Sequence, residues 1–131
     1  MIQANELRIG NWVNYEQTSH IVTGIKNNVI WSRWKGQEND EDEYLDDFDN
    51  YKPIPLSPEI LGKCGFVRYN NTWELVSDKN ERYGVWCFTI YDYRESGYNY
   101  NSAEFPVKLN YLHQLQNLYF ALTGEELTVK L

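Results

Sequence analysis

The chain has 131 residues, a formal net charge of −7, 42% hydrophobic residues and 16% aromatic residues. This length is typical of one domain with one hydrophobic core, and the many aromatic rings indicate a folded chain rather than a disordered one. The negative charge disfavours non-specific binding to nucleic acid and to anionic membrane surfaces. We therefore expect a single domain over residues 1–131.

The sequence favours a cytoplasmic location without membrane segments. No stretch approaches the ~20 consecutive apolar residues that a membrane span requires, and the first residues lack the features of a secretion signal. The two cysteines, Cys64 and Cys87, do not form a CxxC pair. Because a reducing compartment disfavours disulfides, we interpret both as buried free thiols.

Residues 11–34 show the alternation of a three-stranded antiparallel meander, of an SH3-like or small-barrel-like kind. Asn27-Asn28 predicts a two-residue type I′ turn, because Asn tolerates positive φ. This register pairs Ile25 with Ile30 on one face. It also pairs Ile21 with Trp34. We expect the other face to meet water, and it carries Lys26, Gly24, Val22, Trp31 and Arg33.

An acidic run follows, and we expect an exposed loop over about residues 36–52. Its carboxylates are those of Glu38, Asp40, Glu41, Asp42, Glu43, Asp46, Asp47 and Asp49. The run lacks the Gly and the final Glu of a calcium-binding loop, which disfavours a calcium site. A solvated loop is the favoured interpretation, and mimicry of nucleic-acid charge is an alternative.

The second half of the chain predicts two helices with antiparallel strands between them. Ser57-Pro58-Glu59 is typical of a helix start, and Gly65 of a left-handed helix end. Strands alternate from Phe66 to Asn101, where Arg68 is expected to stack on Trp73. An amphipathic helix with N-cap Asn110 follows and stops at Thr123-Gly124. The fold class is therefore α+β.

The most suggestive candidate binding residues are four tyrosines on a predicted strand that ends at Tyr93 and on the antiparallel strand that returns from Tyr98: Tyr91, Tyr93, Tyr98 and Tyr100. Tyrosine offers a large contact area with a polar tip, which suits docking of a protein or stacking of a base. The ordinary alternative is a set of sheet residues with wet hydroxyl groups. Trp31 and Arg33 form a second candidate patch that could stack on a ring or pair with a phosphate.

Catalytic and metal-binding motifs are absent from the sequence, so we expect no cofactor and no metal, and the chain leans away from an enzyme. It has no phosphate-binding loop, dinucleotide fingerprint, GxSxG or HExxH. His20, His113 and the two cysteines are scattered singly, whereas zinc ligands usually come in close pairs.

Three blocks carry a resemblance: Asn5-Glu6-Leu7-Arg8-Ile9-Gly10-Asn11, Pro53-Ile54-Pro55-Leu56, and His113-Gln114-Leu115-Gln116-Asn117-Leu118-Tyr119-Phe120-Ala121-Leu122-Thr123-Gly124. Together they resemble small proteins carried by phages and prophages of Bacteroidetes-type gut bacteria. The resemblance implies provenance and assigns no reaction, ligand or functional residue.

The leading hypothesis is a non-catalytic binding module of phage or prophage type, which recognises a host or phage protein, or a small ligand, through exposed aromatic residues. One alternative is a small protein that binds and sequesters a nucleotide-like ligand, or an enzyme that acts on one, with Trp31, Arg33 and Arg68 supplying stacking and charge. Another is a structural or assembly component of a virion.

Overall fold

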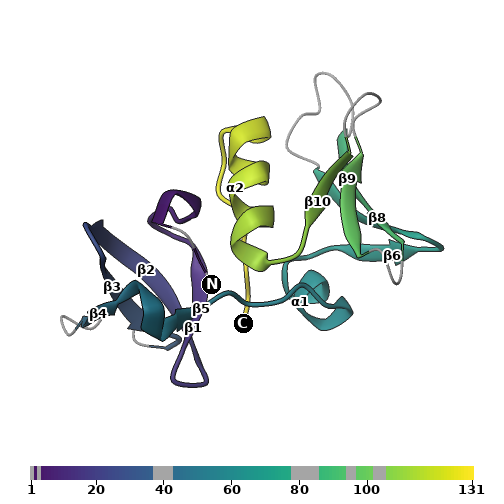
Figure 1. Cartoon of the computed structure of the whole chain (residues 1–131). Coiled ribbons are helices and arrows are strands. Elements are labelled where there is room, and N and C mark those ends of the chain that lie inside the picture. The colour runs from purple at the N-terminus through teal and green to yellow at the C-terminus, as the bar shows by residue number, and fades with distance from the viewer. Residues whose placement is uncertain (1, 3, 37–42, 78–85, 94–96, 102–105) are drawn as a thin grey trace. The chain divides into compact units, whose positions relative to one another are not determined.

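The computed structural model describes residues 2, 4–36, 43–77, 86–93, 97–101 and 106–131. These residues group into two compact units. The first contains residues 1–55 and 111–127 with residue 131, and the second contains residues 56–110 and 128–130. The two units are coloured from purple to blue and from teal to green in Figure 1, with the yellow helix α2 in the first. The single-domain expectation stays a prediction.

The first unit is built on a curled antiparallel sheet of five strands. Its elements are β1 (Trp12–Tyr15), β2 (Thr18–Lys26), β3 (Val29–Trp34), β4 (Tyr44–Asp47) and β5 (Tyr51–Lys52). The strand order is β4-β3-β2-β1-β5, so the chain returns after β4 to pair β5 with β1 (Figure 1). The predicted meander and the α+β class are confirmed, and two further strands extend the meander.

A β-bulge changes the register that the sequence predicted for the meander. Ile25 pairs with Ile30 as expected, but the register shifts between Val22 and Gly24. Ile21 consequently pairs with Arg33 instead of Trp34. Val22 faces the core with 1% of its surface exposed, so its predicted outward position was wrong. The extra residue of a bulge moves the residues on one side of it to the opposite face.

The predicted acidic loop is shorter than expected. Residues 37–42 lie outside the described part of the chain, but residues 44–52 form β4, the 3₁₀ helix η2 (Phe48–Asn50) and β5. Phe48 and Tyr51 are buried in the core of the first unit. Burial of these two aromatic side chains stabilises sheet structure in the second half of the acidic run. The charge pattern alone did not predict it.

Side-chain amides of helix α2 (Leu112–Thr123) bind the segment before β1 and Trp12, the first residue of β1. The amide of Gln116 accepts from the Trp12 N–H (2.9 Å) and donates to the Gly10 carbonyl (3.1 Å). Asn117 accepts from the side chain of Asn11 (2.8 Å) and donates to the Glu6 carbonyl (2.7 Å). Two of the three blocks that carry the sequence resemblance therefore meet in space and hold the first unit together.

The caps of α2 are partly those predicted. Gly124 ends the helix with φ of 72°, as expected, because glycine adopts this left-handed conformation without strain. The N-cap is Tyr111 and not Asn110. The Gln114 side chain accepts a hydrogen bond from the Tyr111 N–H at 3.1 Å, which satisfies one of the free backbone donors at the helix start.

The second unit contains helix α1 (Pro58–Lys63) and another antiparallel sheet of five strands. The strands are β6 (Val67–Tyr69), β7 (Thr72–Ser77), β8 (Trp86–Asp92), β9 (Tyr98–Asn101) and β10 (Pro106–Leu109), in the order β10-β9-β8-β7-β6. Its buried apolar residues are Leu56, Leu61, Cys64, Phe66, Trp73, Phe88, Ile90 and Leu109.

Three local predictions for the second unit are confirmed. Ser57 caps α1 by accepting from the Ile60 N–H at 3.2 Å, and Gly65 follows the helix with φ of 89°. The Arg68 guanidinium lies 5.8 Å from the centre of the Trp73 ring. Among the described residues, no helix has the length and apolar character needed to cross a membrane.

Candidate functional site

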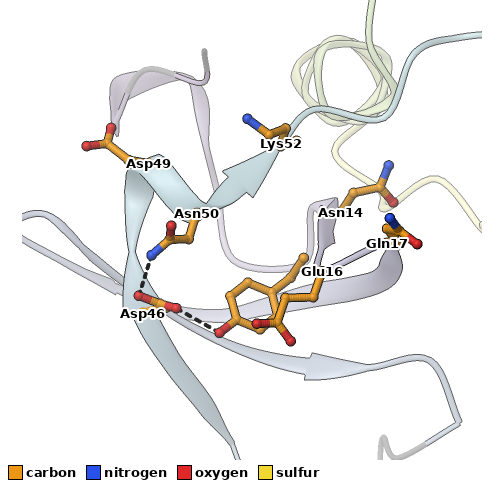
Figure 2. Close-up of a pocket in the computed structure, with 8 residues that line it drawn as sticks. Asn14, Glu16, Gln17, Asp46, Asp49, Asn50 and Lys52 are labelled. Carbon is orange, nitrogen blue, oxygen red and sulfur yellow. Dashed lines mark hydrogen bonds between the residues drawn. The ribbon is translucent and has the colours of Figure 1, made fainter.

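Two neighbouring hollows share Tyr15, at the end of β1 in the first unit, as a lining residue. The larger, which we call the polar hollow, has a volume of about 590 Å³. Its lining residues are Asn14, Tyr15, Glu16, Gln17, Asp46, Asp49, Asn50 and Lys52 (Figure 2). The smaller, which we call the aromatic hollow, has a volume of about 220 Å³. It is lined by Tyr15, Glu16, Thr18, His20, Trp34 and Tyr44.

The turn between β1 and β2 supplies residues to both hollows. Tyr15 pairs with Thr18, so Glu16 and Gln17 form a two-residue hairpin turn. Both have positive φ, 47° and 67°. This conformation strains residues other than Gly, Asn or Asp, and such strain often accompanies functional sites. Both residues are exposed; Glu16 lines both hollows and Gln17 lines the polar one.

Asp46 fixes the position of the Tyr15 ring. Its carboxylate accepts from the Tyr15 hydroxyl (2.7 Å), from the Asn50 amide (2.7 Å) and from the Asp47 N–H (2.8 Å). Figure 2 shows this carboxylate between the amide and the phenol. The hydrogen bond from Tyr15, followed by those from the Asp47 N–H and Asn50, lowers the pKa of Asp46. The same bond, with burial, raises the pKa of Tyr15 to about 12, so Asp46 is ionised and Tyr15 is protonated at neutral pH.

The aromatic hollow has walls of rings set at steep angles to one another. The His20 ring lies 5.2 Å from the Tyr15 ring and 5.2 Å from the Tyr44 ring, at interplanar angles of 66° and 77°. The Tyr15 and Tyr44 rings lie 6.2 Å apart at 47°. Trp34 lies opposite His20 in the β2–β3 register and so shares its face of the sheet.

A buried chain of hydrogen bonds fixes the His20 ring. Its Nδ1 lies 3.1 Å from the Ser32 hydroxyl oxygen, which lies 2.9 Å from the Tyr51 hydroxyl oxygen. Tyr51 also donates to the Ile30 carbonyl at 3.3 Å. All of these residues are buried. Burial lowers the pKa of His20, so the ring is neutral at pH 7.

The hydrogen-bonded pair of His20 and Ser32 supports the lining of the aromatic hollow and does not present a nucleophile. Ser32 is fully buried, so its hydroxyl is closed to a substrate although it lies beside a histidine. Cys64 is also buried, and burial raises the pKa of its thiol to about 12. The described residues contain no group of three or more His, Cys, Asp or Glu side chains that could hold a metal ion.

The structure divides the four tyrosines proposed from the sequence between two faces of the second sheet. Tyr91 and Tyr93 stack on each other at 6.1 Å on one face, where Tyr93 is 47% exposed. Tyr98 and Tyr100 point to the opposite face, because Tyr100 pairs with the buried Ile90. There the Tyr100 ring lies 4.9 Å from the Phe88 ring. The four rings therefore do not form one surface.

Trp31 and Arg33 lie on β3, on the face away from the two hollows, and both are half-buried. The Trp31 ring covers Gly24, and the Arg33 guanidinium forms an ion pair with Glu43 at 3.0 Å. Arg68, the third residue of the proposed nucleotide site, belongs to the second unit.

The residues of the two hollows were not singled out from the sequence as a site. They come from the five strands of the first sheet, from the turn between β1 and β2 and from η2, and strand pairing brings them together. The available signal was the pair Tyr44 and Tyr51 at the ends of an acidic segment, since large rings seldom occur in a solvated loop. No protein-family model, curated protein or solved structure matches the chain.

Proposed function

We propose that the chain is a non-catalytic binding module that recognises a cationic segment of a partner protein at the two hollows beside Tyr15. The observation that carries this proposal is the shared lining, because Tyr15 and Glu16 line both hollows. The polar hollow is lined by three carboxylates and one ammonium group, and most of the residues that line the aromatic hollow carry rings. Such a surface complements a positively charged chain that also carries apolar groups.

The rigidity of the wall supports binding. Tyr15 is fixed by Asp46, and His20 is fixed through Ser32 to Tyr51. A surface that is ordered before its partner arrives loses less conformational entropy when the complex forms. Asp46 accepts three hydrogen bonds and has a lowered pKa, which suits a permanent negative charge better than a proton donor.

The kind of partner follows from the sequence resemblance and from the charge. Resemblance to small phage and prophage proteins favours a host protein, met in the host cytoplasm. A net charge of −7 favours a basic one, because opposite charge accelerates encounter between proteins. We propose that docking at the hollows interferes with a host process.

The test is partner capture with charge reversal at the hollows. Wild type and the double variant Glu16→Lys with Asp49→Lys are immobilised, exposed to host lysate, and the bound proteins are identified by mass spectrometry. The matched control is Glu59→Lys with Glu125→Lys, which changes the net charge equally at exposed positions outside the hollows. We expect the control to retain the partner and the hollow variant to lose it. Equal capture by both variants would contradict the proposal.

The outward face of the second sheet is a second candidate docking surface. Tyr69 is 55% exposed and Tyr93 47% exposed, and Tyr91 stacks beside Tyr93. Replacing Tyr69 and Tyr93 by Ser, with Leu122→Ser as an equally exposed apolar control, separates this surface from the hollows. Loss of the captured partner in the tyrosine variant alone would assign the docking to the sheet.

A further inference from the structure

The aromatic hollow has the form of a cage for one rounded cation. Three of its rings, those of Tyr15, His20 and Tyr44, lie within 5.2–6.2 Å of one another. Their planes meet at 47°, 66° and 77°, so they enclose a corner and do not bound a flat slot. A corner presents several ring faces and edges to a compact group, whereas a planar guanidinium fits best between parallel faces.

Charge at the rim of the hollow favours a positive occupant. Glu16 lines the hollow and is exposed, held there by the strained turn. Asp46 accepts the hydrogen bond of the Tyr15 hydroxyl and so increases the electron density of that ring. Rings attract cations through their negative faces, and a neighbouring carboxylate adds to that attraction.

Most of the residues that line the aromatic hollow carry rings. Among the six residues that line the hollow, Glu16 carries the only carboxylate, and four of the other five carry aromatic rings. An unmethylated ammonium brings three N–H donors and a tight hydration shell, which rings replace poorly. A methylated ammonium keeps the charge, carries fewer donors, and presents methyl groups that pack against rings.

We propose that the aromatic hollow binds a methylated lysine side chain of the partner protein, with the ammonium methyl groups against Tyr15, Trp34 and Tyr44 and the charge facing Glu16. This inference rests on the proposed function and specifies what that site recognises. A volume of about 220 Å³ accommodates the head of one such side chain. The residues that flank this lysine in the partner segment bind in the neighbouring polar hollow.

The proposal is tested by calorimetric titration with four short peptides that differ in one residue: trimethyllysine, lysine, arginine, and the neutral analogue in which a tert-butyl group replaces the trimethylammonium. We expect the trimethyllysine peptide to bind at least tenfold more tightly than each of the other three. Equal affinity of the neutral analogue would mean that shape alone is recognised. Stronger binding of the arginine peptide would identify a guanidinium site. Either outcome, or no binding of the trimethyllysine peptide, would overturn the cage.

Variants locate the binding in the hollow. Tyr44 is 45% exposed, so Tyr44→Ala removes one wall with little effect on folding, and it should weaken trimethyllysine binding at least fivefold. Leu45→Ala is the control, because Leu45 is 56% exposed on the other face of the same strand. Unchanged affinity in Tyr44→Ala would overturn the assignment. Partner capture that needs Glu16 and Asp49 but ignores methylation would leave the binding module standing and remove the cage.

Discussion

The turn residues Glu16 and Gln17 carry the clearest backbone strain of the first unit. Their φ values of 47° and 67° lie in the left-handed region, which glycine adopts without cost. We expect Gln17→Gly to raise the free energy of unfolding by about 0.5–1 kcal/mol, because relief of strain outweighs the added freedom of the unfolded chain. Urea denaturation measures this. Gly65→Ala is the reverse control at φ of 89° and should destabilise, while a loss of stability in Gln17→Gly would show that the turn is not strained.

The two histidines predict how stability depends on pH. Burial lowers the pKa of His20 and that of His113, although a hydrogen bond from the His113 ring to the Glu6 carboxylate opposes the shift in His113. Above pH 6.5, the ordinary pKa of histidine, both rings are neutral in the folded and in the unfolded chain. The histidines therefore do not reduce the free energy of unfolding at that pH. As the pH falls below 6.5, the unfolded chain binds protons first and stability decreases, by at most about 1.4 kcal/mol per pH unit for each histidine.

The variant His20→Asn tests the pH prediction. The Asn amide can keep a hydrogen bond to Ser32 but does not titrate in this range. Urea denaturation at pH 7.5 and pH 5.5 should show a smaller decrease for the variant than for wild type. An equal decrease in both proteins would exclude His20 as a source of the pH dependence.

Helix α2 depends on Gln116 for its attachment to the segment before β1. The side chain is 2% exposed; it accepts a hydrogen bond from the Trp12 N–H and donates one to the Gly10 carbonyl. Gln116→Ala leaves both backbone groups without that partner, so we expect a loss of about 2–3 kcal/mol in the free energy of unfolding. Leu122→Ala on the same helix, 53% exposed, should change it by less than about 0.5 kcal/mol. Similar effects of the two substitutions would contradict the role of the amide.

The elements differ in how well their sequence predicts them. The caps Ser57, Gly65 and Gly124 were predictable because each acts through its own backbone within a few residues. The bulge between Val22 and Gly24 was not, because Thr23 carries no local signal for an extra residue. The pairing of β5 with β1 joins distant segments, so the hollows that it helps to form also escaped prediction.

Across the whole molecule, a net charge of −7 predicts that recognition of a basic segment weakens with salt. The screening length falls from about 10 Å at 0.1 M salt to about 3 Å at 1 M, which slows electrostatically steered association. With the trimethyllysine peptide as probe, stopped-flow fluorescence should show a slower association rate at high salt and a smaller change in the dissociation rate. A salt-independent association rate would exclude charge steering.

The central claim is that the hollows beside Tyr15 are where the chain meets its partner. The most direct measurement follows backbone amide shifts of the ¹⁵N-labelled protein as the trimethyllysine peptide is added. We predict the largest shifts at residues 14–20, at Trp34 and at residues 44–52. An absence of shifts would remove the methyllysine cage alone, and shifts centred on Tyr91 and Tyr93 instead would contradict the account.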